Sequence, residues 1–179
     1  MQDSICMQQV HGNNVVFVTK DDIGKTISDC DGLITTDPNI KLVVRTADCL
    51  PITVNDINGR IHGVIHAGWR GLENKIIGKM VDLINTKFYI INSELLINIG
   101  SHICQKHYEI KDDVAQFFTE IKIKDGKKYL NLEAEAVMQF VDLGVKRENI
   151  KIDKRCTFED PNLFSYRLNK TAERIQTVG

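Results

Sequence analysis

The sequence lacks several features that would assign the protein to a class at once. It contains no apolar run of about 18 residues, so we expect no membrane-spanning helix. Residues 1–12 have neither a basic start nor an apolar stretch, so no secretory signal is visible. The net charge is -1, from 23 basic and 24 acidic residues, which argues against a basic face for nucleic acid.

Proline is scarce, with 3 residues, and no repeat or low-complexity linker divides the chain. The 179 residues are 42% hydrophobic and 26% charged, which is typical of one globular domain. We therefore expect a single domain over residues 1–179. The five cysteines are an odd number and include no CxxC pair, which predicts reduced thiols and a cytoplasmic location.

Short β-branched runs alternate with segments of helical periodicity. Asn131 is a good N-cap for a helix that closes at Gly144. Other helices are expected over 70–86 and 114–121. Strands are expected over 15–18, 33–35, 42–54, 60–66, 95–99 and 150–152. This interleaving predicts the α+β (mixed α/β) class.

The strongest local signal is Asn58-Gly59, which predicts a two-residue type I′ hairpin turn. In that register His66 faces Pro51, and Cys49 lies diagonal to His66 on the same face. Diagonal neighbours are about 7–8 Å apart, which lets the two side chains converge on one atom. Pro51 cannot donate a ladder hydrogen bond, so the ladder is expected to fray or bulge there.

Two faces of different chemistry follow from this register. The apolar face carries Leu50, Ile52, Val54, Ile61 and Ile65, and the polar face carries Cys49, Thr53, Asn55, His62 and His66. Cysteine and histidine that converge in this way suit a metal site or a nucleophilic pair. The plainer alternative is a buried thiol beside a hydrogen-bonded histidine, and His62 is expected to play only an ordinary supporting role.

The segment after His66 passes from a strand end into a helix start. Gly68 and Gly71 allow close backbone approach, and the free N–H groups of a helix start attract anions. Arg70 adds a charged fork that suits phosphate or carboxylate. A plain turn with a solvated arginine is the alternative.

An ordered set of short motifs runs through nearly the whole chain. They are Gln9-Val10-His11-Gly12, Asp31-Gly32-Leu33-Ile34-Thr35, Thr46-Ala47-Asp48-Cys49-Leu50-Pro51, His66-Ala67-Gly68-Trp69-Arg70-Gly71, Tyr108-Glu109-Ile110, Cys156-Thr157 and Phe164-Ser165-Tyr166-Arg167. This set resembles the YfiH/YlmD/laccase-domain family, also called the multicopper polyphenol oxidase or purine nucleoside phosphorylase family.

The resemblance implies a metal site formed by His11, Cys49 and His66, in which His11 is added by the family alone. Three ligands of this kind leave a tetrahedral Zn²⁺ one open position, although the soft donors also suit Cu²⁺. The family fold it implies is a layered α/β sandwich similar to the catalytic domain of cytotoxic necrotizing factor toxins.

The activity implied is phosphorolysis of adenosine, inosine and methylthioadenosine, with adenosine deamination as a side activity. The partners would be a purine nucleoside and phosphate. Arg70 with Gly68 and Gly71 is the expected phosphate cradle, Arg45 is a second candidate, and Asp48 is a candidate proton carrier. In a regular strand, however, the side chain of Asp48 would point away from that of Cys49.

Alternatives of other classes stay open. Two alternatives lie within the family. One is copper-dependent polyphenol oxidation, which requires several copper ions, whereas this sequence offers one well-formed metal site. The other is editing of peptidoglycan precursors. The chain starts only ten residues before His11, so it is expected to lack an N-terminal segment of the family, which would suit a degenerate metal-binding protein. Gly100-Ser101 and residues 171–174 also depart from the family pattern. A metal-free cysteine hydrolase using Cys49 and His66 is a further alternative.

Overall fold

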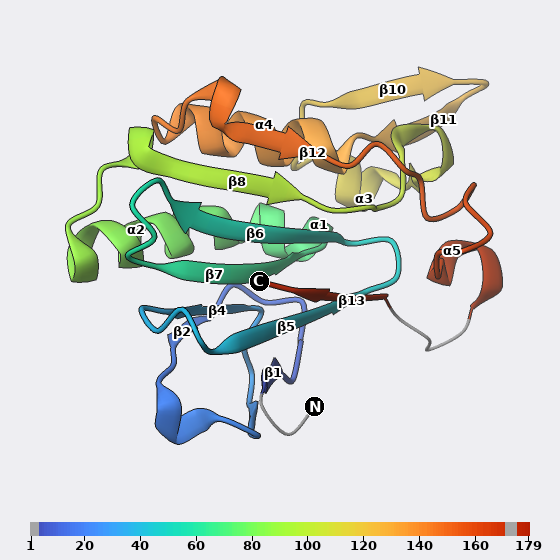
Figure 1. The fold of residues 1–179 in the computed structure, drawn as a ribbon. Coiled ribbons are helices and arrows are strands. Elements are labelled where there is room, and N and C mark those ends of the chain that lie inside the picture. The colour runs from blue at the N-terminus through green and yellow to red at the C-terminus, as the bar shows by residue number, and fades with distance from the viewer. Residues whose placement is uncertain (1–3, 171–174) are drawn as a thin grey trace.

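The computed structural model describes residues 4–170 and 175–179, so the departure expected at 171–174 lies outside the described residues. Three sheets are present, which confirms a mixed α+β class. The first has six strands in the order β12-β8-β6-β7-β4-β2, the second four in the order β13-β5-β1-β3, and the third three in the order β10-β11-β9 (Figure 1).

The strands have the following bounds: β1 Ser4–Met7, β2 Val15–Phe17, β3 Thr26–Ile27, β4 Gly32–Thr35, β5 Lys41–Thr46, β6 Leu50–Asp56, β7 His62–Ala67, β8 Leu95–Ile99, β9 Glu109–Ile110, β10 Ile121–Lys124, β11 Lys127–Leu130, β12 Ile150–Ile152 and β13 Ile175–Val178. The helices are α1 Trp69–Glu73, α2 Ile76–Phe88, α3 Asp112–Ala115, α4 Leu132–Asp142 and α5 Tyr166–Asn169, with 3₁₀ turns η1 Lys20–Asp22, η2 Asn92–Glu94, η3 Gln105–His107 and η4 Arg147–Asn149. Within the described residues, α2 is the longest helix at 13 residues, and none is long and apolar enough to cross a bilayer.

The six-stranded sheet is covered on both faces. On one face, Ile52 and Ile65 pack in a core with Met80 of α2 and Phe140 of α4. On the other face, Val64 of β7 packs with Leu42 and other residues of the four-stranded sheet. The face that the sequence marked as polar is therefore half-buried beneath the smaller sheet, and His62 on it hydrogen-bonds the Ile40 carbonyl at 2.8 Å.

The β6–β7 hairpin has the predicted register, with Pro51 opposite His66 and Asn55 opposite His62. The predicted type I′ turn is wrong. Such a turn requires a positive φ at both central residues, and here only Gly59 has one, at +67°. The loop is wider because the buried Asp56 carboxylate accepts hydrogen bonds from the backbone N–H groups of residues 58, 60 and 61.

Pro51 does not end the ladder, which continues to Leu50 opposite Ala67. The Pro51 carbonyl accepts a hydrogen bond from the N–H of Gly100, just beyond the end of β8. In an antiparallel strand, the nitrogen and the carbonyl of one residue point to the same side, so the nitrogen of Pro51 also points toward β8. The β8 ladder has already ended at that position, so the N–H that proline lacks is not needed there.

Two of the expected elements are each divided. The extended segment 42–54 forms β5 and β6, which belong to different sheets, and the chain changes direction through Asp48 at φ +98°. The helix expected over 70–86 is α1 followed by α2, separated at Lys75, which adopts φ +60°. A left-handed residue interrupts helical hydrogen bonding, so the two helices take different directions.

The helix expected over 114–121 is also wrong beyond its first turn. Only α3 forms there, and the chain continues into the hairpin β10–β11. The turn of this hairpin is Asp125-Gly126, with φ +50° and +72°, which are the signs that a type I′ turn requires. The N-cap prediction is confirmed, because the Asn131 side chain accepts a hydrogen bond from Ala134 N at the start of α4.

Candidate metal centre

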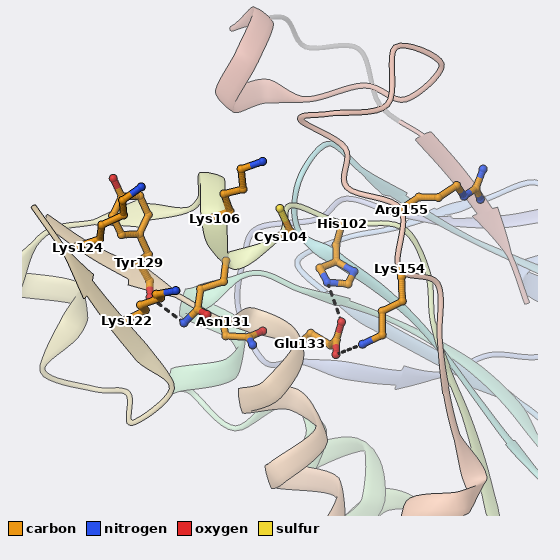
Figure 2. Close-up of a pocket in the computed structure, with 11 residues that line it drawn as sticks. His102, Cys104, Lys106, Lys122, Lys124, Tyr129, Asn131, Glu133, Lys154 and Arg155 are labelled. Atoms are coloured by element: carbon orange, nitrogen blue, oxygen red, sulfur yellow. Dashed lines mark hydrogen bonds and ion pairs between the residues drawn. The ribbon is translucent and has the colours of Figure 1, made fainter.

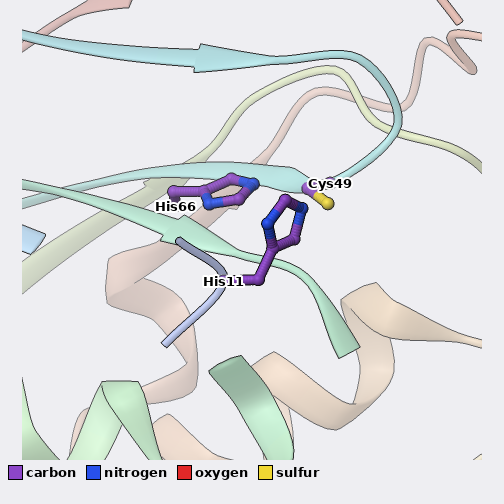
Figure 3. Close-up of side chains that lie close together, drawn as sticks. All are labelled: His11, Cys49 and His66. Atoms are coloured by element: carbon purple, nitrogen blue, oxygen red, sulfur yellow. The ribbon is translucent and has the colours of Figure 1, made fainter. Parts of the chain in front are cut away.

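His11, Cys49 and His66 come together although they are far apart in the sequence. Each offers one ligand atom, and these three atoms lie within 4.8 Å of one another. The His11 and His66 rings meet edge to face, with centroids 4.7 Å apart and planes at 79°. Figure 3 shows both imidazoles directed toward the Cys49 sulfur. We call these three side chains the His–Cys–His trio.

Asp31 holds two members of the trio in place. Its fully buried carboxylate accepts a hydrogen bond from Nδ1 of His66 at 2.7 Å, so the other ring nitrogen is directed toward Cys49. The same carboxylate accepts the backbone N–H groups of residues 10–12 at 2.7–3.2 Å, which fixes the loop that carries His11 at φ +60°. A carboxylate behind a histidine is the usual partner of a metal ligand.

The centre shows one unmet requirement. Within the described residues, Nε2 of His66 is buried beside the Cys49 thiol without a hydrogen bond of normal geometry, whereas Nδ1 is satisfied by Asp31. A buried polar atom without a partner is costly, and a metal ion would use its lone pair. The set of two imidazoles and one thiol therefore fits a metal ion, while His11 and Cys49 are only half-buried and leave it accessible.

Neighbouring groups shift the ionisation of Cys49 and His66. Burial raises the pKa of the Cys49 thiol, but the His11 and His66 imidazoles outweigh it and lower the pKa to about 6. Burial lowers the pKa of His66, but Asp31 and Cys49 outweigh it and raise the pKa to about 9. The surroundings thus favour a thiolate at Cys49, which is the form that binds metals.

The glycines after His66 make room for the trio. A Cβ on Gly68 would lie 2.9 Å from the Cys49 sulfur and 3.3 Å from a carbon of the His11 ring. A Cβ on Gly71 would lie 3.2 Å from the carbonyl oxygen of Gly12. Both positions therefore need glycine for packing, a reason that the sequence motif alone did not indicate.

Asp48 lies next to Cys49 and is 7% exposed, but its carboxylate is already engaged. One oxygen accepts the Thr157 hydroxyl at 2.7 Å and the other accepts the backbone N–H of Arg167 at 2.6 Å. These contacts tie the Cys49 segment to the C-terminal part of the chain. They are typical of a structural anchor.

The arginines expected to bind phosphate lie in different settings. Arg70 is exposed on α1, and its guanidinium stacks on the Trp69 ring at 4.3 Å. Arg45 lies in β5, where Gln9 hydrogen-bonds its backbone and its guanidinium is 3.9 Å from the Cys6 thiol.

The sequence motifs indicated no role for Arg167 or Tyr108. The guanidinium of Arg167 lies 5.2 Å from the centre of the Tyr108 ring and donates to the Glu109 carbonyl at 2.9 Å. Burial and the charge of Cys49 raise the pKa of Tyr108, while the charges of Arg167 and Arg70 act in the opposite direction. Tyr108 is therefore placed in the electrostatic field of both Cys49 and the two cations.

A separate cavity of about 610 Å³ lies beside the segment that follows β8 (Figure 2). Its basic lining residues are Lys106, Lys122, Lys124, Lys154 and Arg155. On its wall, Nε2 of His102 lies 3.6 Å from a Glu133 carboxylate oxygen. None of the three trio residues lines this cavity.

The sequence is similar to known proteins over most of its length. The family described as multi-copper polyphenol oxidoreductase laccase matches residues 1–178. A purine nucleoside phosphorylase of Campylobacter jejuni is 34% identical over 99% of this chain and 77% of its own length. A purine nucleoside phosphorylase of Rickettsia conorii is 33% identical over 84% of this chain, and the match covers 62% of that protein.

Solved structures show the same architecture. The crystal structure of YlmD from Geobacillus stearothermophilus superposes with a TM-score of 0.95 at 28% identity, over 99% of this chain and 73% of that one. YfiH from Bacillus licheniformis gives a TM-score of 0.92 at 25% identity, with the same coverage. The chain therefore belongs to the multi-copper polyphenol oxidoreductase laccase family and has the fold of its YlmD and YfiH structures.

Proposed function

We propose that the protein is a zinc-dependent purine nucleoside phosphorylase with adenosine deaminase side activity. Its substrates would be adenosine, inosine or methylthioadenosine together with phosphate, and its products the free base and ribose 1-phosphate. The observation that carries the proposal is that ligand atoms of His11, Cys49 and His66 lie within 4.8 Å of one another, with the buried Nε2 of His66 next to the Cys49 thiol. The relatives of similar sequence named purine nucleoside phosphorylase supply the reaction class.

The donor set suits a zinc ion. Two imidazoles and a thiolate are ligands that zinc prefers, and three protein ligands leave one coordination position open. The same donors also suit copper, so the ligand types do not decide between the two metals. A bound zinc ion would supply Lewis-acid activation at the open position.

The chain itself would bind and orient the substrates. Arg70 is exposed next to the trio-bearing segment, and its fork geometry suits phosphate. In this proposal Gly68 and Gly71 keep the backbone close to that phosphate, and Arg45 is the second candidate cation. A proton-carrying role for Asp48 stays a prediction, and both of its oxygens already accept hydrogen bonds.

The test is an assay of base release from inosine and adenosine with and without phosphate. We expect release of hypoxanthine or adenine that requires phosphate, with ribose 1-phosphate formed in equal amount. His11→Ala should abolish both this activity and metal binding at the trio. His62→Ala removes an imidazole that lies outside the trio and should retain both properties. Base release without phosphate, or full activity of His11→Ala, would contradict the proposal.

A second candidate is oxidation of phenols by a copper-loaded trio. It is favoured by the polyphenol oxidoreductase description of the family and by the soft thiolate donor. Oxygen consumption with a phenolic substrate, dependent on copper and lost in His11→Ala, would support it. Metal binding without turnover of either substrate would favour the degenerate metal-binding alternative. The cytoplasmic location and the likeness to the necrotizing factor catalytic domain stay predictions.

A further inference from the structure

A second group of cysteine, histidine and glutamate lies outside the trio. Two short turns carry it, each beginning with a cysteine: Cys104 and His107 stand three residues apart, and so do Cys156 and Glu159. In the first turn, His107 N donates to the Cys104 carbonyl at 3.0 Å, and in the second, Glu159 N donates to the Cys156 carbonyl at 3.1 Å. We call these four residues the second cluster.

The two turns face each other. Ligand atoms of Cys104, His107 and Glu159 all lie within 4.8 Å of one another, and Nε2 of His107 is 2.8 Å from Glu159 Oε1. The fourth member is adjacent, because the Cys156 thiol accepts the backbone N–H of Cys104 at 3.2 Å and contacts the Cys104 thiol. Three ligand atoms therefore converge, and the Cys156 thiol lies beside one of them, the sulfur of Cys104.

The thiols are held as metal ligands are commonly held. Backbone N–H groups donate to both sulfurs, from Lys106 to Cys104 and from Cys104 to Cys156. The hydrogen bond from Lys106 acts against burial and the Cys156 thiol, which together raise the pKa of Cys104 to about 11, and hydrogen bonds of this kind orient the lone pairs of a sulfur ligand. The His107 ring is fixed by stacking on Phe158, with ring centroids 4.2 Å apart and an interplanar angle of 15°.

We propose that Cys104, His107 and Glu159 form a second metal site that binds zinc, and that the adjacent Cys156 thiol moves in as the fourth ligand to complete a closed, structural coordination. Two thiols, one imidazole and one carboxylate supply the four ligands of a tetrahedral zinc ion. Paired turns that each supply two ligands three residues apart are a common way to build such a site. The set differs from the trio because it leaves no open position for a substrate.

Without the ion, N–H donors satisfy Glu159. Its Oε1 accepts from both His107 and Lys106 at 2.8 Å, so two donors meet where a cation would bind. Zinc would displace the Lys106 ammonium, which is exposed and free to move into solvent. Metal binding at this site therefore competes with one surface ion pair, a small cost.

The second cluster also bears on the trio. Thr157, next to Cys156, holds the carboxylate of Asp48 through its hydroxyl, and Asp48 precedes Cys49. The Ile103 N–H donates to the Asp48 carbonyl at 3.0 Å, from the residue before Cys104. Zinc that joins the two turns would therefore also fix Ile103 and Thr157, whose hydrogen bonds to Asp48 position the neighbouring Cys49.

The test counts metal ions in protein that cannot use the trio. Cys49→Ala protein is loaded with zinc, passed through a desalting column and analysed for zinc and protein. We expect about one zinc ion per chain in Cys49→Ala and close to none in Cys49→Ala/Cys104→Ser. Cys49→Ala/Cys6→Ser, the matched control at a half-buried cysteine of β1, should keep its zinc.

A milder variant covers the case in which the serine variant does not fold. Glu159 is 47% exposed, so Glu159→Gln should fold normally and weaken zinc binding at least about tenfold in a chelator competition. Cobalt provides a second readout, since thiolate charge-transfer bands should appear in Cys49→Ala and disappear in the serine variant. Absence of zinc from folded Cys49→Ala protein, or unchanged affinity in Glu159→Gln, would overturn the proposal whatever the activity of the trio.

Discussion

The trio and the second cluster each bring three ligand atoms within 4.8 Å of one another, but the fold holds them in opposite ways. His66 is 1% exposed, and its partner Asp31 is fully buried and bound by backbone N–H groups. In the second cluster the carboxylate belongs to Glu159, which is 47% exposed and pairs with the exposed ammonium of Lys106. Burial therefore fixes the trio before any ion arrives. In the second cluster, by contrast, a bound ion must first displace the Lys106 ammonium from Glu159.

The largest effect should come from the buried carboxylate behind the trio. Asp31→Ala leaves Nδ1 of His66 and the N–H groups of residues 10–12 without their acceptor. We expect a loss of about 3–5 kcal/mol in the free energy of unfolding, the range for a broken buried pair. Zinc affinity at the trio should fall at least about tenfold.

Urea unfolding and chelator competition measure these two quantities. Asp112→Asn is the control, because that side chain is 90% exposed and pairs only with Lys128 across the surface. It should change the free energy of unfolding by less than about 1 kcal/mol. Equal changes in the free energy of unfolding for Asp31→Ala and Asp112→Asn would show that burial of the carboxylate does not determine its contribution to stability.

A buried carboxylate far from any metal tests whether burial alone explains the contrast. Asp56 is 3% exposed, pairs with Arg60 at 2.7 Å and accepts three backbone N–H groups of the hairpin loop. Asp56→Ala should lower the free energy of unfolding by about 2–4 kcal/mol. Urea unfolding at neutral pH checks this, and metal binding at the trio should persist in the folded variant.

The same residue gives a pH dependence. Burial raises the pKa of Asp56, but the hydrogen bonds from Arg60 and from the backbone outweigh it and hold the pKa below its ordinary value. A carboxyl group with a lowered folded pKa stabilises fully above its unfolded pKa, and this contribution is lost as the pH falls through the folded pKa. The stability gap between wild type and Asp56→Ala should therefore be constant from about pH 7 to pH 5 and shrink below about pH 4. A gap that widens in acid would contradict this assignment.

The space inside the trio offers a smaller perturbation. Gly68→Ala places a methyl group 2.9 Å from the Cys49 sulfur, so Cys49 and His11 must move apart. We expect a loss of about 1–3 kcal/mol in stability and weaker zinc binding. The control Gly78→Ala lies in α2, where the new methyl would be 3.8 Å from Lys75 Cβ, and it should stabilise by about 0.4–1 kcal/mol.

The smallest effect should come from the cation that competes at the second cluster. Lys106→Gln removes one of the two donors to Glu159 Oε1, so zinc should bind a few-fold more tightly in the Cys49→Ala background. Stability without metal should change by less than about 1 kcal/mol, as is usual for an exposed ion pair. Lys127→Gln, which breaks a similar pair with Glu109, should leave zinc affinity unchanged.

The hairpin shows how far the sequence could lead. Alternation of apolar residues predicted that Pro51 faces His66, because a slip by one residue would exchange the two faces. The loop could not be predicted from Asn58-Gly59, because the Asp56 carboxylate supplies the acceptors that set its shape. The type I′ turn occurs instead at Asp125-Gly126, a signal that was readable in the sequence.

The site was predictable in part for a similar reason. The hairpin alone paired Cys49 with His66, but only the family resemblance selected His11 from the remaining histidines. Asp31 stands in a recognised motif, yet its role depends on contacts with β7 and with residues 10–12 that no spacing reveals. The second cluster was hidden because its two turns are about fifty residues apart and meet only in the folded chain.

Asp48 has a further consequence for the order in which the molecule is completed. All three trio residues lie in the first 66 positions, but the carboxylate beside Cys49 is bound by Thr157 and Arg167, which are 109 and 119 residues further along. Contacts between such distant positions close a large loop, and large loops form late during folding. A ribosome-bound chain could thus expose the ligands well before the geometry matures, and a nascent trio would be open to the wrong ion.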